Sequence, residues 1–317
     1  MPTFLIIGDP HMGEASNRVS ELIKDLNIAK SLSPTGSIDR IFCTGDFEGI
    51  SKFDQAHKGS TLASVPCYIV PGNHDVSDIS GIKQYQGSGD TLHPGPTGTE
   101  KTSFSLTHGN IHVTMLNLYW DGKTNEGWTG GGGSGGEVGT KLLDWLKSDL
   151  AAATTRYKLV MGHEPMYPDK RHKGDSLDWN IKSRDALQKV LRDADVDAYF
   201  AGHTHYARGD LIDNKVLQVQ DGVIGSKAGT TGDSYRSMWF VHIDTNGDMI
   251  ITWKHNKNSS SDWSAPVVKV WKLPQAGGVI PPLPIPPIIQ DLFGDKTSIV
   301  LLIIILVLLV WYINTYT

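Results

Sequence analysis

The sequence predicts an α/β domain with strands in both directions, followed by a C-terminal transmembrane helix. Short apolar runs that end at Gly or Pro alternate with segments of helical periodicity, which is typical of α/β domains. Later apolar runs are joined by turns such as Asn246-Gly247, which favours antiparallel strands and hence a mixed arrangement. An uncharged apolar run near the C-terminus predicts the membrane segment.

Strands and helices are expected to alternate through the first 200 residues. Six apolar runs predict buried strands: Phe4–Ile7, Ile41–Thr44, Cys67–Val70, His112–Leu118, Lys158–Met161 and Ala198–Phe200. Three segments between them carry apolar residues at helical spacing: Val19–Leu32, Thr140–Ala151 and Ser183–Asp193. Four later runs predict antiparallel strands: Lys215–Gln220, Ser237–Asp244, Asp248–Lys254 and Val267–Leu273.

Composition narrows the functional classes. The chain has 29 Lys and Arg against 34 Asp and Glu, so it lacks the basic excess that indicates nucleic-acid binding. Its two cysteines, Cys43 and Cys67, lie in apolar runs and are interpreted as core residues rather than a disulfide. Twelve histidines exceed what packing requires, which suggests metal ligands.

The C-terminal region divides at a change in composition. Residues 1–273 are expected to form one folded domain, 274–296 a Pro-rich linker and 297–314 a transmembrane anchor. The repeated prolines of the linker predict an extended spacer. Binding of this linker to a proline-recognising protein partner remains an open alternative.

The anchor prediction rests on the run Ser298–Ile313, which contains no charged residue, Gly or Pro. Trp311 and Tyr312 stand where interfacial aromatic residues are found in membrane proteins. Because the first residues show no basic, apolar signal-peptide pattern, we expect a single-pass C-terminal anchor with the preceding domain in the cytoplasm.

Five short polar motifs each follow a predicted strand. They are Gly8-Asp-Pro-His11, Gly45-Asp-Phe-Glu48, Gly72-Asn-His-Asp75, Gly162-His-Glu-Pro165 and Gly202-His-Thr-His205. Ligands gather beyond the carboxyl ends of strands in α/β sheets, and Gly permits the sharp turn that exposes the next side chain. Carboxylate, imidazole and amide groups without thiolates suit manganese, iron or zinc. Each motif alone is commonly a turn, but five in this order predict one shared metal site.

The motif series resembles that of the calcineurin-like metallophosphoesterases over residues 4–254. The resemblance implies a four-layer α/β/β/α sandwich of two mixed β-sheets. It implies that Asp9, His11 and His205 bind one metal ion, that Asn73, His163 and His203 bind a second, and that Asp46 bridges both. It also implies that His74 is the catalytic histidine near the leaving group and that Asp75 orients it.

The function implied by this resemblance is hydrolysis of phosphate mono- or diesters by a hydroxide held between two divalent or trivalent metal ions. The alternative is a membrane-tethered metal-binding scaffold without turnover. Purple acid phosphatases have a Tyr three residues after the bridging Asp, where this chain has Gly49, so we expect no iron–tyrosinate colour.

The sequence signal for substrate choice is weaker. The basic segment 170–173 could attract anionic substrates at the mouth of the site or be a solvated loop. The remaining histidines match no motif and are not expected to be ligands; among them are His93, His108, His112, His172 and His255.

Overall fold

The structure is a computed structural model that describes residues 2–99, 101–123, 135–225, 236–256, 263 and 267–273. The chain divides into two compact units, Met1–Gly277 and Gly278–Thr317, and the second lies outside the described residues. The predicted linker, the predicted anchor and most of the Gly-rich segment near residue 130 also lie outside them. None of the helices in the described ranges has the length and apolarity needed to span a bilayer.

One mixed sheet carries the N-terminal strands. In spatial order its strands are β13 (Val267–Leu273), β12 (Met249–Asn256), β11 (Arg236–Ile243), β1 (Thr3–Ile7), β2 (Arg40–Cys43) and β3 (Cys67–Ile69). The strands β1, β2 and β3 are parallel, whereas β11, β12 and β13 continue the sheet in antiparallel fashion. Asn246 and Gly247 lie in the turn between β11 and β12, where Gly247 has a φ of 85°.

The second mixed sheet has seven strands. In spatial order they are β4 (His93–Pro94), β5 (Phe104–His108), β6 (Ile111–Met115), β7 (Tyr157–Met161), β8 (Ala198–Ala201), β10 (Val216–Gln220) and β9 (Arg208–Ile212). The central strands β6, β7, β8 and β10 are parallel, and both sides end in antiparallel strands.

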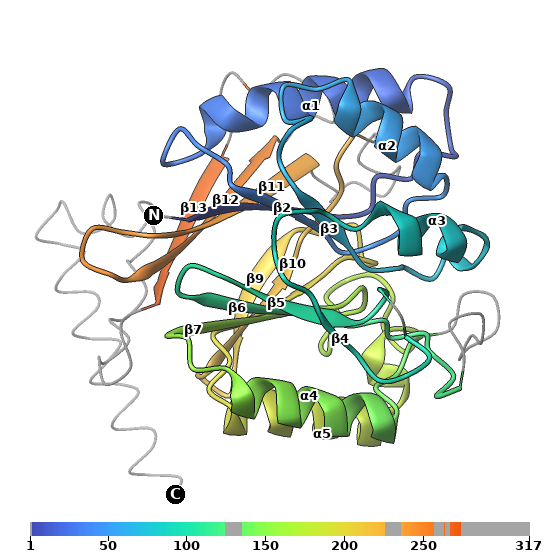
Figure 1. Ribbon diagram of the computed structural model, residues 1–317, viewed down its shortest axis with the longest axis vertical. Coiled ribbons are helices and arrows are strands. Elements are labelled where there is room, and N and C mark those ends of the chain that lie inside the picture. Colours follow the sequence, from blue (N-terminus) through green and yellow to red (C-terminus); the bar gives the residue numbers. More distant parts are fainter. Residues whose placement is uncertain are drawn as a thin grey trace, which may run out of the picture. The chain divides into compact units, whose positions relative to one another are not determined.

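Helices cover the outer face of each sheet (Figure 1). The helices α1 (Arg18–Leu32), α2 (Ile50–Lys58) and α3 (Ile79–Tyr85) pack on the first sheet. The helices α4 (Thr140–Ala152) and α5 (Ile181–Asp193) pack on the second. Two 3₁₀ turns, Val76–Asp78 and Leu177–Trp179, precede α3 and α5. The expected four-layer sandwich of two mixed sheets is therefore confirmed for the described residues.

Both faces of the central strands are buried, which explains their continuous apolar sequences. In β1, Phe4 and Ile6 join the core between the sheets, whereas Leu5 and Ile7 face the helices α1 and α2. The alternation of side chains along a strand thus divides one apolar run between two cores.

Candidate metal centre

All five motifs lie at the same ends of parallel strands. Asp9 follows β1, Asp46 follows β2, and Asn73 follows β3 of the first sheet. His163 follows β7 and His203 follows β8 of the second. Because these strands are parallel within each sheet, their carboxyl ends bring ligands from both sheets to one edge of the sandwich.

The backbone at these positions adopts an uncommon conformation. The residues Asp9, His11, Asp46, His203 and His205 all have positive φ, between 43° and 67°. Non-glycine residues in this left-handed region are uncommon and concentrate at functional sites, where surrounding structure holds them. The uncommon backbone conformation of these turns therefore sets the direction in which the side chains point.

Glycines allow the loops to approach one another. A Cβ atom on Gly72 would overlap the Asp46 carboxylate, and one on Gly202 would overlap the Asp9 carboxylate. The sharp turn expected of these glycines is found at Gly45, which has a φ of 112°. At Gly72 and Gly202, glycine is needed because a side chain would collide with a carboxylate of a neighbouring motif.

The first group of predicted ligands comprises Asp9, His11, Asp46 and His205, whose nearest ligand atoms lie within 4.8 Å of one another. The Nε2 atoms of His11 and His205 are 2.8 Å apart. Asp9 Oδ1 lies 3.4 Å from His205 Nε2, and Asp46 Oδ2 lies 3.8 Å from His11 Nε2.

The second group comprises Asp46, His163 and His203, with Asn73 between the two imidazoles. Asn73 Oδ1 lies 3.1 Å from His163 Nε2 and 3.0 Å from His203 Nδ1. Asp46 Oδ2 lies 3.3 Å from His163 Nε2. The structure thus brings together all seven predicted ligands in two groups that share Asp46.

The spacing and chemistry of these atoms fit two cations. Metal–ligand bonds of about 2.0–2.2 Å place neighbouring ligand atoms roughly 3.0–3.5 Å apart, which is close to the distances found in both groups. His163 Nδ1 lies 2.8 Å from the carbonyl oxygen of Thr44, to which it can donate. In the neutral ring, such backing by a carbonyl keeps the proton on Nδ1 and leaves Nε2 as the nitrogen that can bind a metal ion.

The electrostatics of the two groups also favour cations. Burial lowers the pKa of His11 and His163, but neighbouring carboxylates outweigh it and raise their pKa values to about 9 and about 10. Burial conversely raises the pKa of Asp46, and the adjacent imidazoles outweigh it and hold that pKa below its usual range. Without bound cations, protons on the histidines balance the buried negative charge.

Asp75 and His74 make different contacts from those expected. The buried Asp75 carboxylate accepts hydrogen bonds from the backbone N–H groups of Asp46, Phe47, Glu48 and Gly72, at 2.8–3.1 Å. It therefore joins the loops after β2 and β3 rather than orienting the His74 ring. The contact with that ring comes from Glu48, whose Oε1 lies 2.8 Å from His74 Nδ1.

A residue not expected at the site lies against it. The His172 ring stands 4.1 Å from the His203 ring, between centroids, and its Nδ1 lies 2.9 Å from Asp175 Oδ2. His172 belongs to the basic segment 170–173 and has a φ of 58°. This segment therefore reaches the site through its histidine, a placement for which the sequence contains no periodic signal.

Glu164 anchors the chain next to His163. Its buried carboxyl group accepts hydrogen bonds from the Tyr119 hydroxyl and the Gly136 N–H, both at 2.6 Å. Burial raises the pKa of Glu164 to about 8. Tyr119 is itself buried and fixes this loop through its hydrogen bond to Glu164.

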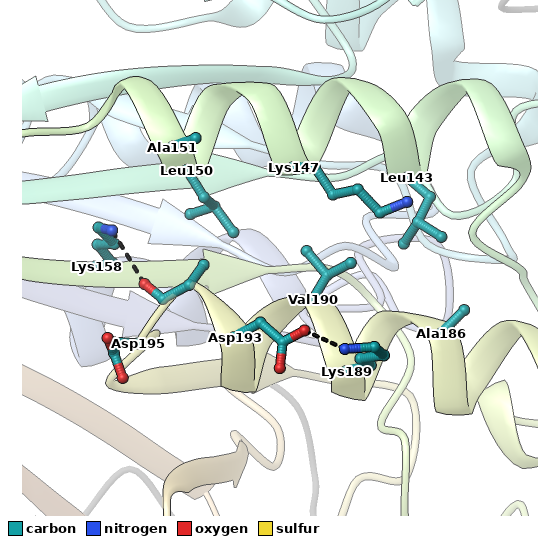
Figure 2. A pocket seen from close by; sticks show the side chains of 11 residues that line it. Leu143, Lys147, Leu150, Ala151, Lys158, Ala186, Lys189, Val190, Asp193 and Asp195 are labelled. Atoms are coloured by element: carbon teal, nitrogen blue, oxygen red, sulfur yellow. Dashed lines mark hydrogen bonds and ion pairs between the residues drawn. The ribbon is translucent and has the colours of Figure 1, made fainter.

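A cavity among the described residues lies elsewhere. It has a volume of about 520 Å³ and lies between α4 and α5, where Leu143 and Val190 form part of its wall (Figure 2). The predicted ligands do not line this cavity. The candidate metal centre is therefore assigned to the two ligand groups at the strand ends and not to this cavity.

A sequence model of the family described as "Calcineurin-like phosphoesterase" matches residues 2–207. The chain belongs to this family. The match contains all five motifs, and the calcineurin-like fold of two sheets accounts for their convergence. Members of this family use a dinuclear metal centre, in agreement with the two adjoining ligand groups.

Three relatives of this calcineurin-like chain are phosphoesterases by name. Purple acid phosphatase 21 of Arabidopsis thaliana is 28% identical over 49% of this chain and 34% of its own length. Tartrate-resistant acid phosphatase type 5 of Rattus norvegicus is 26% identical over 64% of this chain and 66% of its own length. A cAMP/cGMP dual specificity phosphodiesterase of Mycobacterium tuberculosis is 26% identical over 65% and 60%. The chain thus spans between one third and two thirds of the length of these relatives.

Two solved structures share the fold. A dimetal phosphatase from Danio rerio has a TM-score of 0.59 and 14% identity, covering 84% of this chain and 98% of its own. GAP50, titled the anchor in the inner membrane complex of Plasmodium, has a TM-score of 0.55 and 17% identity, covering 86% and 89%. At sequence identities this low, the comparison shows a shared fold and nothing about function.

Proposed function

We propose that this chain is a binuclear metal-dependent phosphoesterase that hydrolyses phosphate mono- or diesters at a membrane. The observation that carries the proposal is the sharing of Asp46 between two groups whose ligand atoms are close enough to one another to hold one cation each. Manganese, iron and zinc all suit the ligand set of carboxylate, imidazole and amide groups.

Different residues of the chain would have different roles in hydrolysis. When bound, two cations activate a water molecule and offset the charge of the phosphoryl oxygens. Asp46 would hold the two cations at a fixed spacing. His74 would donate a proton to the leaving alkoxide; the support is that it is about half exposed and that its ring lies beside that of His11. His172 would border the opening where the ester enters.

Gly49 separates this chain from the coloured purple acid phosphatases. It stands where those enzymes have Tyr, and its φ of 135° is a conformation that side chains rarely adopt. A tyrosine ligand at this position would therefore require a different backbone. We propose that the iron-loaded chain lacks the tyrosinate absorption band of that branch.

Asp46→Asn tests the proposal, because it removes one negative charge from both groups at nearly constant size. We expect manganese stoichiometry to fall below two and kcat/KM to fall at least about 100-fold, since outer-shell changes alone cost up to about that much. Metal content and hydrolysis of aryl phosphate mono- and diesters are measured on the purified full chain. Asp144→Asn, on an α4 side chain that is 64% exposed, is the control and should behave as the wild type.

The alternative function is a membrane-tethered scaffold that binds metal without turnover. The fold of this chain is shared by GAP50, which is described as an anchor, and this likeness supports the alternative. A wild-type chain that binds two manganese ions yet hydrolyses neither ester class would favour the scaffold. A panel including cyclic nucleotides would separate the phosphatase-like from the phosphodiesterase-like substrates suggested by the relatives.

We further propose that residues 297–314 anchor the chain, with the catalytic domain in the cytoplasm. The support is the uncharged apolar run in the sequence. Removing residues 297–317 should release the protein from carbonate-washed membranes while leaving hydrolysis of a soluble ester within about twofold of wild type. Retention of the shortened chain on the membranes would contradict this assignment.

A further inference from the structure

The Glu48 carboxylate lies between two imidazole rings of the site. Its Oε1 is 2.8 Å from His74 Nδ1, and its Oε2 is 3.3 Å from His11 Nδ1. The first contact is a hydrogen-bond distance, whereas the second is longer and is not aligned as a full hydrogen bond. One carboxylate thus contacts both the proposed proton donor and a predicted metal ligand.

The backbone of Glu48 is fixed in this position. Its φ is 48°, in the left-handed region where non-glycine residues are uncommon. Its N–H donates to Asp75 Oδ1 at 3.1 Å, as part of the group of hydrogen bonds that joins the loops after β2 and β3. Asp75 therefore influences His74 indirectly, by holding the residue that contacts its ring.

The contact between Glu48 and His74 determines which ring nitrogen of His74 faces the substrate. An acceptor next to Nδ1 favours the ring form that carries a hydrogen on Nδ1 and fixes the ring plane. The opposite nitrogen, Nε2, then remains available to the substrate. His74 is about half exposed, so few other contacts would define this orientation.

We propose that Glu48 is a positioning residue that fixes the His74 ring, so that Nε2 faces the leaving-group oxygen, and that it supports His11 from the same carboxylate. This inference rests on the proposed phosphoesterase function for its kinetic consequence. The donor is the imidazolium form of His74, which carries a proton on each ring nitrogen. As the attacking oxygen bonds to phosphorus and the bond to the leaving oxygen breaks, the Nε2 proton passes to the leaving oxygen. The ring is left neutral, with its remaining proton on Nδ1 facing Glu48.

The kinetic test compares leaving groups in the manganese-saturated full chain. Glu48→Ala should lower kcat for an alkyl phosphate by roughly 10- to 100-fold, because a poor leaving group needs a well-placed proton. With a p-nitrophenyl ester, whose leaving group needs little protonation, kcat should fall less than about threefold. Equal losses for both esters would overturn the positioning role.

Glu14→Ala is the matched control. Glu14 is another carboxylate near His11, with Oε1 at 3.9 Å from His11 Nδ1. Its side chain is 46% exposed, and none of the contacts found among the described residues joins it to His74. We expect its leaving-group dependence to match that of the wild type. A selective loss with alkyl esters in Glu14→Ala as well would point to local charge instead of the Glu48 contact and would contradict the proposal.

A spectroscopic test is independent of turnover. The zinc-loaded, ¹⁵N-histidine-labelled chain is measured in alkaline buffer, where the neutral ring can be observed. The neutral His74 ring should carry its hydrogen on Nδ1, and Glu48→Ala should convert it to a mixture of the two tautomers. An unchanged His74 signal would overturn the inference. If the wild type hydrolyses no ester but this spectral change occurs, the proposed function fails while the positioning contact stands.

Discussion

At the scale of single residues, metal binding should release protons. Without metal, the pKa values of His11 and His163 lie at about 9 and about 10, so both rings are protonated at pH 7.5. Ligation requires neutral rings, so about two protons should leave per chain and manganese affinity should rise with pH up to roughly those values. Calorimetry in two buffers of different ionisation enthalpy measures the release. Binding heats that are the same in both buffers would contradict it.

The residues of the site could be predicted where a polar residue directly follows an apolar strand. Asp9 and Asp46 are of this kind, because the strand fixes where their loops begin. The approach of Glu48 and His172 to the site could not be predicted, since both reach it through left-handed loop conformations with no sequence periodicity. The contacts of Asp75 could not be predicted either, because its partners are backbone N–H groups of another loop.

At the scale of elements, the buried strands and three of the helices were predictable from periodicity. The strand expected over His112–Leu118 ends earlier, at Met115. The elements β4, β5, β9, α2 and α3 were not predicted. They are short or partly polar, and contacts made elsewhere in the fold stabilise them more than their own sequence does.

A buried carboxylate, Asp149, joins α4 to the second sheet. Asp149 on α4 accepts hydrogen bonds from Ser105 on β5 and Thr114 on β6, and its Oδ2 lies 2.9 Å from His112 Nε2. Burial raises the pKa of Asp149, but these partners outweigh it and lower the pKa below its usual value. The carboxylate therefore stabilises the fold above the unfolded pKa, and this stabilisation is lost as pH falls through the folded pKa.

Asp149→Asn should lower the free energy of unfolding by about 1–3 kcal/mol at pH 7 and weaken its decrease in acid. Urea unfolding at pH 7 and near pH 3 measures both effects. Lys147→Gln, on the exposed side of the same helix, is the control and should change stability by less than about 0.5 kcal/mol. Equal stability of Asp149→Asn and wild type at pH 7 would show that α4 docks through its apolar face alone.

At the scale of the whole molecule, two sheets of different strand composition deliver their loops to one edge. The first sheet supplies Asp9, His11, Asp46 and Asn73, and the second supplies His163, His203 and His205. Neither sheet alone completes a ligand group, since Asp46 needs His163 for the second and His205 for the first. Metal binding should therefore stabilise the packing of the two sheets as well as the site.

Anomalous X-ray scattering from crystals of the manganese-loaded chain tests the account most directly. We predict two manganese peaks about 3.5–4 Å apart, with the Asp46 carboxylate between them and Asn73 beside only one. A single peak, or peaks remote from Asp46, would contradict the binuclear centre.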